Sequence, residues 1–93
     1  MSAEILIIDD NSDIREILND LIIEAGYSTR LAANYNQALS EIDKKLPDVA
    51  IIDVKLDKGD NDGIELLNHI KNKNKNIPVI IISGHANIDM AIK

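Results

Sequence analysis

Cysteine, phenylalanine and tryptophan are absent from this 93-residue sequence, and the only aromatic residues are two tyrosines. Without cysteine the chain has no disulfide, thiol nucleophile or thiolate metal site. The core must be aliphatic, and no aromatic platform is available to stack the bases of single-stranded nucleic acid. No apolar run approaches the roughly 18 residues that span a bilayer, and the first residues lack the pattern of a signal peptide. We therefore expect a cytoplasmic protein.

Positive charge is also scarce, because ten basic residues stand against sixteen acidic ones and the net charge is −6. This balance disfavours nucleic acid and anionic membranes as direct partners of the chain. Lysine alternates with asparagine over residues 71–76, but before a proline this is more typical of a solvated helix end and loop. With 45% hydrophobic and 28% charged residues, we expect one globular domain over residues 1–93.

Short apolar runs alternate with amphipathic segments along the chain. The runs are typical of strands, and all but the second are apolar enough to be buried on both faces of a parallel sheet: Glu4–Ile8, 28–31, 49–52 and Val79–Ile82. Between them, apolar residues spaced three and four apart predict helices over residues 14–25, 35–46 and 64–72. This alternation indicates an α/β fold with a parallel sheet and right-handed crossovers.

The apolar strands belong inside the sheet and the polar strand at residues 28–31 belongs at an edge, so the expected strand order is 2-1-3-4. In that order the chain reverses direction between strands one and three. Ligands of open α/β sheets bind at the carboxyl ends of the strands at such a point. Asp9 and Asp10 follow strand one and Asp53 follows strand three, so we expect these carboxylates to meet.

Gathered carboxylates need a counter-ion or raised pKa values, because two like charges about 4 Å apart repel by roughly 1 kcal/mol in water and about 4 kcal/mol at an effective dielectric of 20. Mg²⁺ fits better than Ca²⁺, since it commonly takes one or two carboxylates, keeps several waters and bridges to phosphate oxygens. With the metal in place, the Asp53 carboxylate can attack a phosphoryl group. The simpler alternative, aspartates that only cap helices, is common for one residue and weaker for three together.

Ser83 follows the fourth strand, where its hydroxyl can donate a hydrogen bond to a phosphoryl oxygen. Serine at such a place is as often a turn or cap residue, so the chemistry alone leaves both roles open. His69 and His85 have no partner at metal-ligand spacing and belong to no recognisable Ser-His-Asp arrangement. We expect both histidines on the surface or in loops.

An acidic pair after strand one, a lone aspartate after strand three and a serine after strand four together resemble the receiver domains of two-component response regulators. The resemblance covers essentially the whole chain and implies a flavodoxin-like three-layer fold. It implies that Asp53 is the phosphoacceptor and Ser83 the switch hydroxyl. Asp10, Asp53 and the backbone carbonyl of Lys55 would ligate Mg²⁺, and Asp9 would hold a bound water. A sensor histidine kinase would supply the phosphoryl group, and a separate output domain would regulate transcription.

Residues 83–91, and a loop after Asp53 that is two residues longer than usual, look like the NtrX branch of NtrC-type regulators. The resemblance also implies missing parts, because receivers continue through a fourth helix, a fifth strand that ends in a phosphate-binding lysine, and a fifth helix. We therefore expect an incomplete receiver domain in which strand five and helix five are absent. Strand Val79–Ile82 would then be an exposed apolar edge that invites self-association.

Two other functions fit parts of the pattern. A phosphatase of the haloacid dehalogenase type also uses a strand-end aspartate and Mg²⁺, but it needs a second aspartate two residues later. Asn11, Ser12 and Lys55 stand at those places. A scaffold or dimerisation module of receiver fold that is never phosphorylated stays open, and Mg²⁺ binding and acyl-phosphate formation would separate the two. We expect a signalling module that shifts a conformational equilibrium, not an enzyme.

Overall fold

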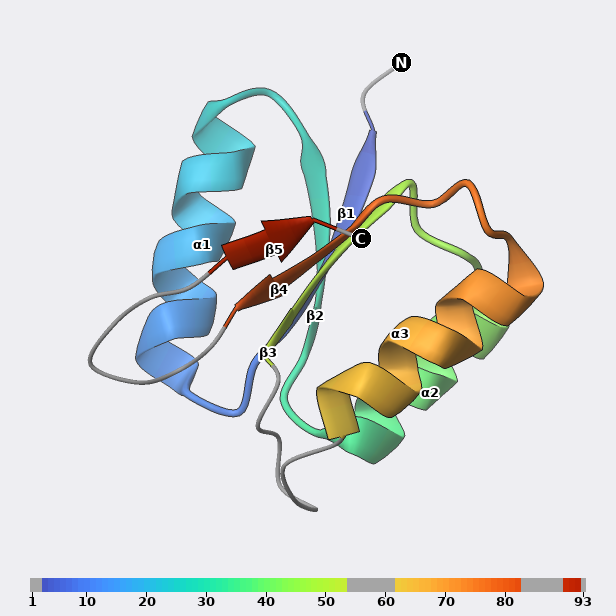
Figure 1. Cartoon of the computed structure of the whole chain (residues 1–93). Helices are drawn as coiled ribbons and strands as arrows, with labels where there is room; N and C mark the ends of the chain where they lie inside the picture. Colours follow the sequence, from blue (N-terminus) through green and yellow to red (C-terminus); the bar gives the residue numbers. More distant parts are fainter. Residues whose placement is uncertain (1–2, 54–61, 83–89, 93) are drawn as a thin grey trace.

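The computed structural model of the chain describes residues 3–53, 62–82 and 90–92 and consists of a mostly parallel sheet with helices on both faces (Figure 1). The strands are β1 (Glu4–Ile8), β2 (Ser28–Ala32), β3 (Val49–Asp53), β4 (Val79–Ile82) and β5 (Met90–Ile92). The helices are α1 (Ser12–Glu24), α2 (Tyr35–Lys44) and α3 (Asp62–Lys73). Helix α1 covers one face of the sheet, and α2 and α3 cover the other. No helix in these ranges has the length and apolar character to cross a membrane.

The sheet has the strand order β2-β1-β3-β4-β5, which confirms the predicted parallel order 2-1-3-4. Strand β1 is central and pairs in parallel with both β2 and β3. In this register Ile8, the last residue of β1, lies beside Ile52 of β3. The next residues along the two strands, Asp9 and Asp53, therefore lie side by side at the carboxyl edge of the sheet.

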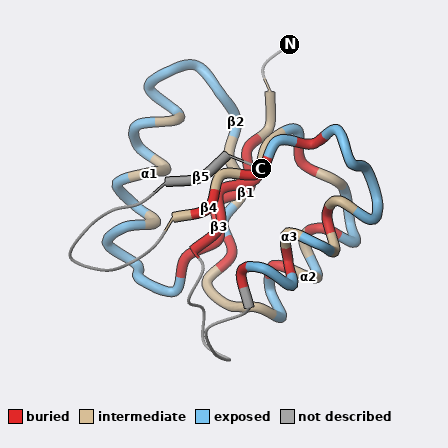
Figure 2. Tube along the Cα trace, in the orientation of Figure 1, coloured by how far each residue is buried: buried red, intermediate tan, exposed pale blue. Residues whose placement is uncertain are grey.

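The two faces of the sheet are covered unequally (Figure 2). Most buried side chains belong to a cluster between the sheet and α2 and α3, made of Leu6, Ile8, Ala32, Ala38, Ile42, Ala50, Ile52, Leu66, Ile70, Ile77, Val79 and Ile81. Within the described ranges, the buried cluster on the α1 face contains only Ile5, Ile7 and Ile51, with Leu18 and Ile22 of α1 packed against it. Helix α1 has no fully buried residue, and its Ile17 and Leu21 are 56% and 58% exposed.

Asparagine caps begin α1 and α2. The Asn11 side-chain oxygen accepts hydrogen bonds from the backbone N–H groups of Asp13 and Ile14, at 2.9 and 3.2 Å. Asn34 accepts from the N–H of Gln37 at 2.8 Å, and the Gln37 side chain accepts in return from the N–H of Ala33 at 2.8 Å. This reciprocal arrangement resembles a capping box and fixes the direction in which α2 leaves the sheet.

Strand β5 differs from the expectation for the end of the chain. It is antiparallel to β4, with Ile80 beside Ile92 and Ile82 beside Met90. Residues 80–82 of β4 therefore have partners on both sides, and the prediction that strand four presents a free apolar edge is wrong for them. An unpaired strand edge attracts any extended segment nearby, and here the chain itself supplies one. Because β5 runs away from the carboxyl edge, it is not the expected fifth strand that ends in a site lysine.

Candidate functional site

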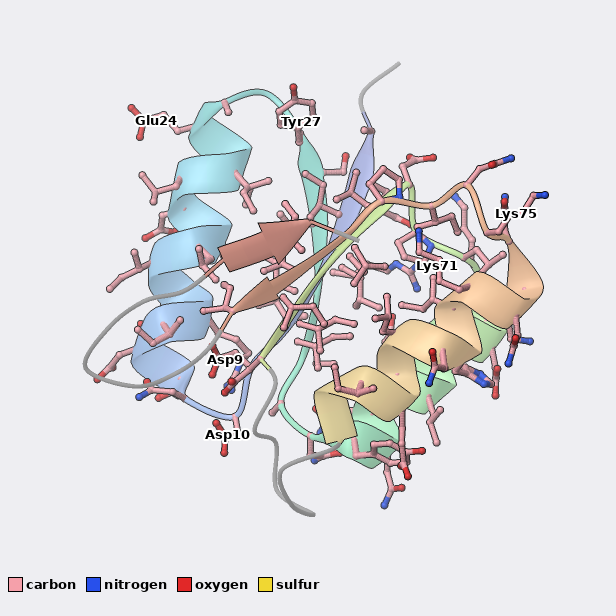
Figure 3. All side chains as sticks on the ribbon, viewed as in Figure 1. Asp9, Asp10, Glu24, Tyr27, Lys71 and Lys75 are labelled. Carbon is pink, nitrogen blue, oxygen red and sulfur yellow. The ribbon has the colours of Figure 1, made fainter. Side chains whose placement is uncertain are left out.

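Three carboxylates meet at the carboxyl edge of the sheet, as the sequence predicted. Asp9 follows β1, Asp10 follows Asp9, and Asp53 is the last residue of β3. Each of them offers an oxygen, and these oxygens all lie within 4.8 Å of one another. Asp9 and Asp53 are only 5% and 7% exposed, whereas Asp10 is open to solvent. Figure 3 shows Asp9 and Asp10 at the end of β1, close to the first turn of α1, with Asp10 the lower of the two in this view. We call these three residues the acidic site.

Asp9 is held by hydrogen bonds to both its backbone and its side chain. Its N–H donates to the carbonyl of Ala32 at 3.1 Å, which continues the pairing of β1 with β2 by one residue. One carboxylate oxygen accepts from the N–H of Asn11 at 2.9 Å. The Asp9 carbonyl accepts from Nη1 of Arg15 at 2.8 Å. The turn between β1 and α1 is therefore fixed around this residue.

Burial raises the pKa of the Asp9 carboxyl above its usual value, and the negative charge of Asp10 raises it further. Three contacts oppose this rise: the hydrogen bond from the Asn11 N–H, the charge of Arg15 and a hydrogen bond with Asp53. Burial and the charge of Asp10 outweigh these three contacts, so the net shift of the Asp9 pKa is upward. The protein groups around Asp9 thus leave part of the cost of its negative charge uncompensated, and a bound cation would compensate it.

The acidic site fits a hard cation such as Mg²⁺. All three of its ligand groups are carboxylates, with no imidazole or thiolate among them, and oxygen is the donor that such ions take. Two of the groups are buried and fixed by the ends of β1 and β3, while Asp10 faces solvent. A site open on one side suits Mg²⁺, which keeps several of its waters. Asp9, Asp10 and Asp53 would hold the ion.

Other predicted site residues fall outside this cluster or outside the described part of the chain. Lys55, Ser83 and His85 lie beyond the described residues. His69 is at the surface between α2 and α3, as expected, where its Nε2 lies 3.1 Å from the Asp43 carboxylate.

The sequence did not predict that Arg15 contacts the acidic site, because its partner is the backbone carbonyl of Asp9 and a backbone partner leaves no motif in the sequence. One signal was present in the sequence, since Arg15 is the only basic residue before Arg30.

A doubly wound α/β sheet with an acidic site at its carboxyl edge defines a flavodoxin-like class of protein. Within this class, the family model described as response regulator receiver domain matches residues 5–93. The chain belongs to the response regulator receiver domain family. Receiver domains are signalling modules, and they generally bind Mg²⁺ at an acidic pocket of this kind.

Relatives support the predicted branch of the family. The nitrogen assimilation regulatory protein NtrX of Azorhizobium caulinodans is 39% identical over 92 residues, which are 99% of this chain and 20% of that protein. Sporulation initiation phosphotransferase F of Bacillus subtilis is 41% identical over 90 residues, which cover 97% of this chain and 71% of that protein. The chain thus spans about a fifth of the length of NtrX.

Solved structures share the fold. The receiver domain of NtrX from Brucella abortus is 36% identical, with a TM-score of 0.78 over 89% of this chain and 69% of that one. A CheY-like receiver domain from Methanospirillum hungatei is 26% identical, with a TM-score of 0.83 over 94% of this chain and 68% of that one. The resemblance to NtrX inferred from the sequence is thereby confirmed.

Proposed function

We propose that this chain is a phosphoaccepting receiver module, in which the Asp53 carboxylate receives a phosphoryl group from a phosphohistidine of a sensor histidine kinase. The observation that supports this most strongly is the meeting of Asp9, Asp10 and Asp53 within 4.8 Å at the ends of two neighbouring strands. A carboxylate is a competent covalent acceptor, and Asp53 is held rigidly because it belongs to a strand paired on both sides.

The transfer forms one bond and breaks one. A carboxylate oxygen of Asp53 bonds to phosphorus, the bond from phosphorus to the histidine nitrogen breaks, and the product is an acyl phosphate. Asp9 and Asp10 would hold Mg²⁺ together with Asp53, and the ion supplies positive charge that offsets the charge of the phosphoryl oxygens. The burial of Asp9 and Asp53 keeps both carboxylates in place before the phosphoryl group arrives.

The remaining parts of the mechanism are carried over from the family resemblance. The Lys55 carbonyl would be a further ligand of the ion, and the Ser83 hydroxyl would donate a hydrogen bond to an oxygen of the transferred phosphoryl group. Relatives that are regulators, such as NtrX and the DNA-binding transcriptional regulator NtrC of Salmonella typhimurium, suggest that the signal controls transcription. The output then resides in a domain outside this chain, and this module contacts no nucleic acid itself.

Intact-mass spectrometry after incubation with Mg²⁺ and acetyl phosphate tests this proposal. We expect one added phosphoryl group on the wild type, none on Asp53→Asn, and one on the control variant Asp20→Asn. Asp20 is an exposed aspartate of α1 outside the acidic site. Its substitution by asparagine changes the net charge by the same amount as Asp53→Asn. Addition of EDTA should abolish the modification. An unmodified but folded wild type, or equal modification of Asp53→Asn, would contradict the proposal and favour a scaffold of receiver fold.

A further inference from the structure

Arg15 links the first turn of α1 to the end of β1. Its Nη1 donates to the Asp9 carbonyl at 2.8 Å, and its own N–H donates to the carbonyl of Asn11 at 3.0 Å. The side chain is half-buried. The guanidinium therefore reaches back over the turn that carries Asp9 and Asp10.

The bond to the Asp9 carbonyl constrains more than Asp9. A peptide unit is planar, so the carbonyl of Asp9 and the N and Cα atoms of Asp10 lie in one rigid plane. The strand pairing through the Asp9 N–H fixes the near side of this residue, but no bond of that pairing fixes the plane that follows it. Arg15 holds this plane, and the position of the Asp10 Cα depends on it.

We infer that Arg15 is a positioning residue of the acidic site: its guanidinium holds the Asp9–Asp10 peptide, and through it the direction of the Asp10 carboxylate toward a divalent cation. The inference rests on the proposed function for its choice of ligand.

Charge and geometry give effects of opposite sign at this position. A guanidinium close to the site repels a cation, so if charge alone mattered, removing it would tighten Mg²⁺ binding. If Arg15 orders the Asp10 carboxylate, removing it costs the ordering of one ligand and weakens binding. The direction of the change therefore identifies the role.

The test compares Arg15→Met and Arg15→Lys with Lys75→Met. Lys75 lies between α3 and β4, at the opposite edge of the sheet from Asp9 and Asp10 (Figure 3). Its substitution by methionine removes the same charge far from the site. Because the chain has no tryptophan, Mg²⁺ titrations are followed by the backbone amide signals in NMR spectra. We expect the Kd for Mg²⁺ to rise about tenfold in Arg15→Met and not to change in Lys75→Met. In Arg15→Lys we expect a rise of only about threefold, because the lysine at position 15 can still donate one hydrogen bond to the Asp9 carbonyl.

A second measurement needs no ion. In the metal-free protein, hydrogen exchange at the Asn11 amide reports whether the turn is ordered, because this N–H is bonded to the Asp9 carboxylate. We expect exchange to be about tenfold faster in Arg15→Met than in Lys75→Met, while amides of β3 are unchanged. A role limited to the stability of α1 would lower the melting temperature of Arg15→Met without changing either readout in the folded protein.

The outcomes separate the inference from the proposed function. Unchanged or tighter Mg²⁺ binding by folded Arg15→Met, with Asn11 exchange as in the wild type, overturns the role of Arg15 and leaves the phosphoacceptor proposal intact. If the folded wild type does not bind Mg²⁺, both the role of Arg15 and the phosphoacceptor proposal are overturned. If Arg15→Met does not fold, Arg15→Lys decides the matter, and an affinity equal to that of the wild type in that variant overturns the inference.

Discussion

Asp9 combines burial with negative charge, and this combination sets the character of the site. Its carboxyl is nearly inaccessible, and the groups around it leave its pKa above the usual value. The metal-free protein thus holds an acid in conditions that disfavour its ionised form. Such perturbed groups gather where a protein binds or reacts, which agrees with the place of Asp9 at the end of β1.

The raised pKa predicts a specific dependence of stability on pH. The folded-state pKa of Asp9 lies above its ordinary value of 3.8, so Asp9 adds stability at pH values below 3.8 and loses this contribution as the pH rises through the raised pKa. We therefore expect Asp9→Asn to gain free energy of unfolding relative to the wild type over this range. Urea unfolding in EDTA between about pH 3 and pH 7 measures the difference. A difference that does not change with pH would contradict the prediction.

The ends of helices were less predictable from sequence than their existence. Periodicity extended the second helix to residue 46, but α2 ends at Lys44. Arg30 of β2 binds this end of the helix, because its guanidinium donates to the carbonyls of Glu41 at 2.9 Å and of Lys45 at 2.6 Å. Lys45 itself has an extended backbone, with φ −163° and ψ 130°. Pro47 also disfavours a helical conformation at the residue before it. The contacts of Arg30 with this helix end join residues that are distant in the sequence, and no local pattern predicts them.

The Asn34 cap gives a prediction at the level of one helix. Asn34→Ala should lower the free energy of unfolding by about 1 kcal/mol, because the N–H of Gln37 loses its acceptor. The matched control is Asn36→Ala, an exposed position within the first turn of α2. There alanine has the better helix propensity, so a small gain of a few tenths of a kcal/mol is expected. Chemical denaturation measures both, and equal losses in the two variants would show that the cap contributes nothing.

The whole molecule was predictable to the extent that burial determines strand position. The ranking of strands by apolar content gave the parallel order, and the order placed Asp9, Asp10 and Asp53 together. Strand β5 was not predicted, because three residues are too few for a periodic pattern and its pairing depends on a neighbouring edge. The contact of Arg15 with the Asp9 carbonyl depends on the path of the folded turn.

The unequal faces of the sheet predict unequal sensitivity to mutation. Leu66 of α3 is fully buried in the larger cluster, so Leu66→Ala should cost about 2–5 kcal/mol through lost contacts and a cavity. Leu21→Ala in α1 is the same substitution at a position that is 58% exposed. It should lower the free energy of unfolding by only about 0.5 kcal/mol. Thermal and urea unfolding of the two variants test this, and similar losses would mean that α1 is packed more closely than its exposure indicates.

Binding of an ion to the acidic site should stabilise the whole fold. A ligand that binds only the folded state adds about 2.7 kcal/mol at a concentration one hundred times its Kd. We expect Mg²⁺ to raise the melting temperature of the wild type, and to have a much smaller effect on Asp10→Asn, which lacks one carboxylate of the site. Calorimetry with and without Mg²⁺ measures the shift. An equal shift in both proteins would place the bound ion elsewhere.

The pairing of Ile8 with Ile52 makes the acidic site a gauge of strand register. A slip of one residue between β1 and β3 would displace Asp53 by about 3.3 Å along its strand and turn every side chain of the slipped strand to the opposite face. Such a misaligned conformer keeps every carboxylate but cannot bring them together around one ion. Cation binding therefore selects, among compact arrangements of the chain, the one in which these two strands are correctly aligned.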